Sequence, residues 1–152
     1  MTDWRSRLAE LRIELPAVAA PVAAYVPAVQ TGNLVYTSGQ LPFIDGELQQ
    51  TGKVGGAVAA DTAKDAARTC ALNALAAIDA LVGLDSVVRI VKVVGFVASA
   101  EGFTGQPGVI NGASELFGEV FGDAGVHARS AVGVAELPLN APVEVEVIAE
   151  VR

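Results

Sequence analysis

The chain has 152 residues, a length that suits one domain with its own hydrophobic core. Its net charge is −7 and its ten Lys and Arg residues are spread along the chain, which argues against a nucleic-acid partner. Hydrophobic residues make up 52% of the chain, but no apolar run approaches the ~20 residues of a membrane span. We therefore expect the excess apolar surface to lie in a subunit interface.

The cysteine and histidine content bears on location and on metal binding. One cysteine, Cys70, excludes an internal disulfide and fits a reducing compartment. No Cys/His grouping has the spacing of a zinc site, so we expect no metal. The N-terminus lacks the pattern of a signal peptide, and the expected location is the cytoplasm.

The first thirty residues predict a helix and a connector. Apolar residues at three- and four-residue steps indicate a helix over residues 2–15, capped by Thr2 or Asp3 and ended by Pro16. Residues 16–31 are rich in Ala, Val and Pro without a clear period. They predict an extended connector whose prolines exclude a central strand.

A strand and a hairpin follow. Residues 34–41, after a Gly-Asn turn, predict a strand. The pair Asp45-Gly46 predicts a hairpin turn, with a short strand over residues 47–50. Glycines at positions 52, 55 and 56 then predict a flexible loop.

The middle of the chain alternates helix and strand. An apolar stripe that includes Leu81 and a buried, inert Cys70 predicts a helix over Asp61–Val82. Thr62 and Asp65 have capping-box spacing, and Gly83 suits the end of the helix.

Residues 87–98 form a nearly continuous β run, which predicts a strand covered by helices on one face and by a neighbouring subunit on the other. A loop over residues 99–107 leads to a helix that begins at Pro107 and ends at Gly122. Two more β runs close the chain. The order β-β-α-β-α-β-β predicts an α+β fold with an antiparallel or mixed sheet and helices on one face.

The last two runs contain the candidate chemistry. Arg129 opens the first, and arginine can hold a carboxylate through two parallel hydrogen bonds. Glu144, Glu146 and Glu150 share one face of the second. If the two runs paired as a hairpin, Arg129 would lie nearer Glu150 than Glu144. A site that combines Arg129 with Glu144 then needs another connection, such as one across a subunit boundary. A surface arginine and a solvated row of glutamates is the alternative.

Two segments resemble the Rid family, also called YjgF or L-PSP endoribonuclease-like: Gly32 to Pro42, and the Ala-Arg-Ser motif at 128–130 with its continuation to Glu146. The resemblance runs from about Tyr25 to the end of the chain. We expect one Rid-like domain over residues 1–152, and the helical extension over residues 1–15 resembles a divergent, longer subgroup of the family. The resemblance also implies a chorismate-mutase-like fold and a homotrimer with sites in the clefts between subunits.

For the deaminase branch, the resemblance implies hydrolysis of reactive 2-imino or enamine acids to 2-oxo acids and ammonia, without a metal or organic cofactor. Arg129 would grip the substrate carboxylate, and Glu144 would position or activate water. Tyr25, Asn111 and the backbone of Ser38-Gly39 would line the cleft.

The chain departs from that branch at three places. Ala131 stands where cysteine is frequent, Gly133 follows two residues later, and the loop over 99–108 is longer than in compact members. A small carboxylate ligand is therefore the broader expectation.

A non-catalytic binding or sensing module is the second reading of the function, and an endoribonuclease, disfavoured by the net charge, is the third. His127, the single histidine, would handle protons or cap the turn before the strand.

Overall fold

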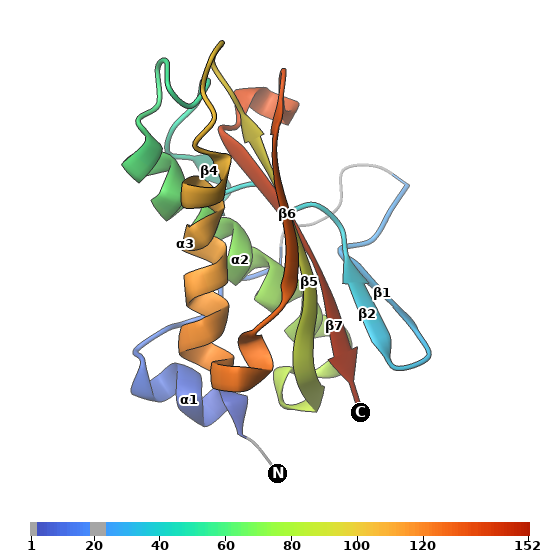
Figure 1. The fold of residues 1–152 in the computed structure, drawn as a ribbon. Coiled ribbons are helices and arrows are strands. Elements are labelled where there is room, and N and C mark those ends of the chain that lie inside the picture. Colours follow the sequence, from blue (N-terminus) through green and yellow to red (C-terminus); the bar gives the residue numbers. More distant parts are fainter. Residues whose placement is uncertain (1–2, 19–23) are drawn as a thin grey trace.

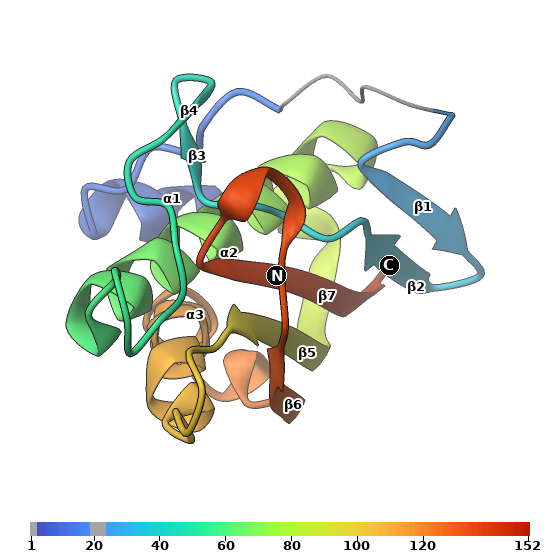
Figure 2. The same cartoon turned by 90° about the horizontal axis from the view of Figure 1, so that it is seen from above.

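A five-stranded mixed sheet organises the computed structural model, which describes residues 3–18 and 24–152. The strand order is β1-β2-β7-β5-β6, and helices α2 and α3 pack against one face (Figures 1 and 2). This confirms the predicted α+β class with two helices on one face. The elements are α1 Trp4–Glu10, β1 Ala28–Thr31, β2 Leu34–Thr37, β3 Phe43–Ile44, β4 Glu47–Leu48, α2 Ala60–Val82, β5 Val87–Ala98, α3 Gln106–Phe121, β6 Ala128–Val134 and β7 Val143–Val151, with short 3-10 turns at Leu84–Ser86, Gly122–Gly125 and Pro138–Asn140.

The N-terminal helix is shorter than predicted. The side chain of Asp3 caps it by accepting a hydrogen bond from the backbone N–H of Ser6 at 3.0 Å, whereas Thr2 lies outside the described residues. The helix ends at Glu10 rather than near Leu15, because Arg12 adopts a left-handed backbone conformation with φ of 58°. A residue in that conformation cannot continue an α-helix.

Helix α1 is attached to the domain through Trp4. The indole Nε1–H donates to the carbonyl of Val87 at 2.8 Å, and the ring meets Phe121 edge to face at 4.9 Å between centroids. The helical extension therefore packs on the domain at the ends of β5 and α3 (Figure 1).

The connector contains a strand that its composition did not predict. Ala28–Thr31 pairs antiparallel with β2 and forms an edge of the sheet, where a preceding proline is tolerated. Strand β2 ends at Thr37 rather than at residue 41, and beyond it Gln40 makes only an isolated bridge with Val145. The predicted hairpin is confirmed: Asp45 and Gly46 join β3 to β4, both with positive φ.

Helix α2 matches its predicted span, but its start and one stripe residue differ. The residue before the helix is Ala59, with no side-chain cap, so the capping box expected from Thr62 and Asp65 is wrong. Leu81 is 45% exposed, so its place in the buried stripe is wrong too. Gly83 ends the helix with φ of 80°, as predicted. Cys70 is fully buried, and that burial raises the pKa of its thiol well above the ordinary value.

The last two strands do not form a hairpin. Strand β6 pairs parallel with β5 after the crossover through α3, while β7 pairs antiparallel with the other side of β5. Strand β5 therefore lies between β6 and β7, and β6 becomes an edge strand. The hairpin hypothesis is wrong because two strands joined through a helix can pair in parallel, which left the opposite side of β5 for β7.

Helices α2 and α3 cover one face of the sheet, and no helix that the structure describes covers the other, which we call the open face (Figure 2). Along β7, Val143, Val145 and Val147 are buried under the helices, whereas the alternate residues are partly exposed. The apolar side chains of the open face include Val29, Leu34, Tyr36, Val94, Phe96, Val132, Val134 and Ile148. Within residues 3–18 and 24–152, no helix combines the length and apolar character needed to cross a membrane.

Candidate functional site

Arg129 lies on the covered face of edge strand β6. It is in register with Val93 of β5, which is itself in register with Val147, and both valines are buried beneath the helices. Strand alternation therefore directs the arginine toward α3. Its Nη1 donates to Asn111 Oδ1 at 2.7 Å and to Ser114 Oγ at 3.2 Å. Arg129 is a half-buried, oriented guanidinium rather than a solvated surface group.

Both partners of Arg129 come from α3, three residues apart, a spacing that puts them on one face of the helix. Asn111 was predicted as a cleft residue, and the structure brings it to Arg129. Ser114 was not predicted. Its spacing from Asn111 was the available signal, but serine is too common on helix surfaces for that spacing to stand out.

His127 also joins this group. Its Nε2 lies 2.9 Å from Ser114 Oγ, and its Nδ1 lies 2.6 Å from the carbonyl oxygen of Gly125 in the turn before β6. The expected turn cap is therefore present, together with a contact to Ser114. We call Asn111, Ser114, His127 and Arg129 the arginine half.

Glu144 lies on the open face, in register with Phe96 of β5. Its carboxylate rests against Gly39: a Cβ built on that glycine would come within 2.2 Å of Glu144 Oε2. The absence of a side chain at position 39 therefore makes room for the carboxylate. Glu146 follows on the same face of β7.

The carboxyl of Glu144 is half-buried and close to a second negative charge. Burial, and secondarily repulsion from Glu146, raise the pKa of Glu144 above its ordinary value of 4.5. Both effects disfavour the ionised form. A carboxyl shifted in this direction is better suited to accept and return a proton near neutral pH.

Ser38 directly precedes Gly39 and is hydrogen-bonded to the connector segment that follows Tyr25. The backbone N–H of Ser38 donates to the carbonyl of Pro27 at 2.8 Å, and its hydroxyl donates to the carbonyl of Val26 at 2.6 Å. These bonds hold the end of the connector beside Ser38-Gly39. Tyr25, one residue earlier, is 52% exposed. We call Tyr25, Ser38, Gly39 and Glu144 the glutamate half.

The two halves do not meet within one chain. Arg129 points to the covered face and Glu144 to the open face, with β5 between their strands. They are also three residues out of register, so their Cα atoms are on the order of 14 Å apart. A hairpin would have placed Arg129 nearer Glu150. In the actual register Glu150 is offset by the same three residues in the other direction.

The two departures along β6 also face the helices. Ala131 packs against the hydrophobic core, and Gly133 leaves space that Ser99 and Gln106 fill. A Cβ at position 133 would come within 2.9 Å of both side chains. The glycine at position 133 therefore leaves room for Ser99, at the start of the loop, and for Gln106, at the start of α3.

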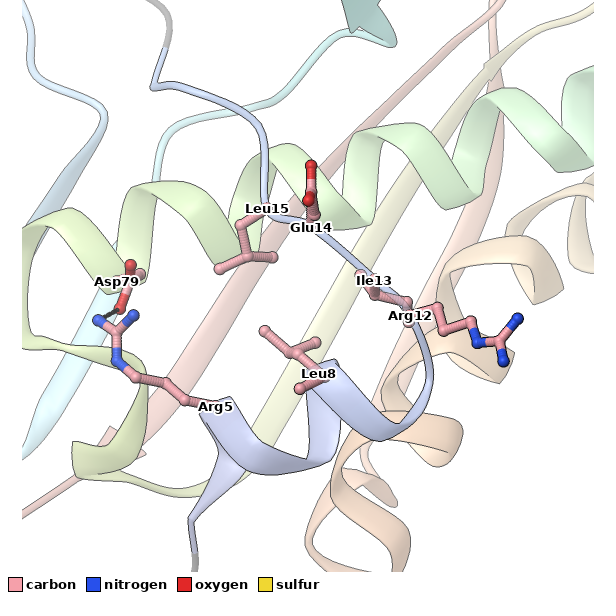
Figure 3. Close-up of a pocket in the computed structure, with 8 residues that line it drawn as sticks. Arg5, Leu8, Arg12, Ile13, Glu14, Leu15 and Asp79 are labelled. Atoms are coloured by element: carbon pink, nitrogen blue, oxygen red, sulfur yellow. Dashed lines mark hydrogen bonds and ion pairs between the residues drawn. The ribbon is translucent and has the colours of Figure 1, made fainter.

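A separate hollow of about 860 Å³ lies between α1, the segment after it and the end of α2 (Figure 3). It contains an Arg5–Asp79 ion pair and none of the predicted site residues. Within the part of the chain that the structure describes, no group of three His, Cys, Asp or Glu side chains could hold a metal ion.

Comparison with known proteins identifies the family. The family model "Endoribonuclease L-PSP" matches residues 16–151. A 2-iminobutanoate/2-iminopropanoate deaminase from Dermatophagoides farinae is 34% identical over 136 residues, which cover 90% of this chain and 92% of that protein.

Two solved structures extend the comparison. A protein of unknown function from Agrobacterium tumefaciens is 46% identical with a TM-score of 0.90, covering 98% of this chain and 92% of the other. E. coli TdcF with bound serine is 28% identical with a TM-score of 0.64, covering 90% and 93%. The YjgF protein of E. coli, at 34% identity, is another structural neighbour, which confirms the chorismate-mutase-like fold. The chain belongs to the endoribonuclease L-PSP family, the Rid or YjgF family that its sequence motifs resemble.

Proposed function

We propose that the protein hydrolyses small 2-imino or enamine acids to 2-oxo acids and ammonia. The observation that carries this proposal is the oriented guanidinium of Arg129, held by Asn111 and Ser114 through one nitrogen. Among residues 3–18 and 24–152, no hydrogen bond engages the Nη2 and Nε donors of Arg129, which favours a small acid as ligand.

Glu144 supplies the proton chemistry of the proposed reaction. Its carboxylate takes a proton from water as the oxygen attacks C2 of the imino acid. The proton then passes to the nitrogen, which gives a carbinolamine with one hydroxyl and one amino group on C2. The hydroxyl proton moves to the amino group, again through Glu144, as the C–N bond breaks, so that ammonia leaves and C2 becomes the carbonyl of a 2-oxo acid. Support comes from the raised pKa of Glu144, which places the group closer to neutral pH than an ordinary glutamate.

The complete site requires a second chain. Because Arg129 and Glu144 face opposite sides of the sheet, the arginine half of one subunit would meet the glutamate half of its neighbour in a homotrimer. The apolar open face is consistent with such an assembly, since its side chains remain partly exposed in the single chain.

The relatives support the same ligand class. A protein 34% identical to this chain is named a 2-iminobutanoate/2-iminopropanoate deaminase, and TdcF, another structural relative, holds serine, which also carries a carboxylate. Binding without catalysis is the second candidate, favoured by Ala131 and Gly133, where the chain departs from the deaminase branch.

The direct assay is ammonia and 2-oxo acid release from imines generated in place from several amino acids. The purified protein should accelerate release, and Arg129→Ala should abolish the acceleration because a methyl group cannot neutralise the carboxylate. A thermal shift with 2-oxo acids but no acceleration with any imine would establish the binding module instead.

A further inference from the structure

We propose that Ser114 and His127 are positioning residues, which hold the guanidinium of Arg129 in the orientation that receives a carboxylate. This inference rests on the proposed role of Arg129 as the carboxylate anchor. It adds two residues that do not themselves touch the ligand.

The contacts form one continuous series of hydrogen bonds. Arg129 Nη1 donates to Ser114 Oγ at 3.2 Å, and Ser114 Oγ lies 2.9 Å from His127 Nε2. His127 Nδ1 then lies 2.6 Å from the carbonyl oxygen of Gly125. The guanidinium on β6 is thus connected through α3 to the turn that precedes β6.

The chemistry of the end groups sets the direction of every hydrogen bond. A carbonyl oxygen only accepts, so Nδ1 of His127 carries the hydrogen. In the neutral ring Nε2 is then an acceptor, and the Ser114 hydroxyl must donate to it. The lone pairs of Ser114 Oγ are left to accept from Arg129. The direction of each hydrogen bond is therefore fixed, and the series of bonds runs from the Arg129 guanidinium to the backbone carbonyl of Gly125.

The histidine ring is held in place at the far end of this series of hydrogen bonds. Phe117 of α3 meets it edge to face, with centroids 5.9 Å apart and planes at 90°. Gly125 packs so closely on α3 that a Cβ there would come within 2.2 Å of the Phe117 carbonyl oxygen. The carbonyl that accepts from His127 is consequently held against the same helix that carries Ser114.

These contacts hold the Arg129 guanidinium through one nitrogen, Nη1. Nη1 has two hydrogens, and Asn111 and Ser114 accept one each. Two bonds at one nitrogen fix the plane of the group, and its other donors make no hydrogen bond within the described part of the chain. Loss of the Ser114 bond should let the guanidinium rotate about its link to Asn111, and carboxylate binding should weaken.

The first test needs no ligand. The chain has one histidine, so the ¹⁵N imidazole signals of the labelled full-length protein belong to His127 without assignment. The neutral ring should be the Nδ1–H tautomer, with Nε2 unprotonated and hydrogen-bonded. An Nε2–H tautomer would overturn the proposal, because Ser114 could then not donate to the ring.

The second test measures 2-oxobutanoate binding by calorimetry. Ser114→Ala should raise Kd about tenfold, and Ser114→Thr, which keeps a hydroxyl, should restore most of the affinity. His127→Gln keeps an acceptor near Nε2 and should bind better than His127→Asn, which can bond Gly125 but cannot reach Ser114. Thr69→Ala, which removes a hydroxyl from α2, is the control and should bind as the wild type does.

The outcomes separate this inference from the proposed function. If the wild type binds 2-oxobutanoate and Ser114→Ala binds it equally well, the positioning role is wrong while the anchor role stands. If the wild type neither binds the acid nor accelerates imine hydrolysis, the anchor role and the positioning role fail together. If imines are turned over, Ser114→Ala should raise KM more than it lowers kcat, because the carboxylate contact is made in the ground state as well.

Discussion

At the scale of single residues, the carboxyl of Glu144 is in an unfavourable place for a negative charge. It is half-buried, it has Glu146 beside it on the same strand face, and it packs against the backbone of Gly39. Such an arrangement costs folding energy at neutral pH, and structures retain costs of this kind mainly at functional sites.

The cost should appear as a dependence of stability on pH. A carboxyl whose folded-state pKa is raised contributes stability that is fully present below its unfolded pKa, and that contribution is lost as the pH rises through the folded value. The window therefore begins near 4.5 and extends upward. Glu144→Gln removes this titration, so its melting temperature relative to the wild type should increase across that window. Glu150→Gln, on the same face of β7, is the control, and an equal increase in both variants would contradict burial of Glu144 as the cause.

The sequence was informative about Arg129 and Asn111, which the structure brings together, and about Gly39 and Glu144, which it also brings together. Arg129, Gly39 and Glu144 belong to the two motifs that carry the family resemblance, and the role of Asn111 was implied by that resemblance. Ser114 was missed because its role depends on the tertiary contact between α3 and β6. A helical serine has the same local sequence signal whether or not an arginine lies over it.

At the scale of elements, α2 and α3 approach closely where α3 has a glycine. A Cβ at Gly112 would come within 2.0 Å of the backbone oxygen of Lys64. Two ion pairs, Lys64–Glu115 and Arg68–Glu119, bridge the same two helices on the surface. Because they are exposed, each contributes little, and the close backbone contact sets the packing of the layer.

Gly112→Ala should therefore destabilise the protein even though alanine favours helices. The methyl group meets backbone rather than a movable side chain, and overpacking of this kind costs about 1–3 kcal/mol. Gly118→Ala, on the same helix but with open space around it, should instead stabilise by about 0.5–1 kcal/mol. Denaturant unfolding measures both, and a Gly112→Ala variant as stable as Gly118→Ala would refute the close approach.

Local sequence patterns predicted the long helices and strands well, but they predicted poorly which strands pair in the sheet. The spans of α2, β5 and α3 follow from apolar periodicity sustained over many residues. Strand β1 is too short and too close to prolines to give such a signal. The order of β6 and β7 around β5 is decided by the crossover through α3 and by packing, and no local pattern in the 128–151 stretch records it.

At the scale of the whole molecule, the two faces of the sheet underlie the proposed assembly. Helices cover one face, while the open face carries a row of partly exposed apolar side chains across its strands. The same sheet separates the arginine half from the glutamate half. In the proposed trimer, a neighbouring copy of the chain would both bury the open face and complete the site.

Val94→Lys tests the role of the open face. Val94 is in register with Glu146, so a lysine there has a partner within its own chain and should leave the subunit folded. In a trimer the added charge would be buried at the interface, so we expect a folded monomer by sedimentation and loss of imine hydrolysis. Leu81→Lys, at an exposed apolar position on α2, is the control and should remain assembled. An assembled Val94→Lys variant would show that the interface lies elsewhere.

In the proposed trimer, Arg129 and Glu144 of one site belong to different chains, so two inactive variants should complement each other when they are mixed. Arg129→Ala and Glu144→Gln chains with different tags are co-expressed, and the doubly tagged trimers are purified. In a cyclic trimer containing both variants, one of the three interfaces pairs an intact arginine with an intact glutamate, so about a third of wild-type imine hydrolysis should return. If the mixed trimers are as inactive as the separate variants, Arg129 and Glu144 do not act together across a subunit boundary.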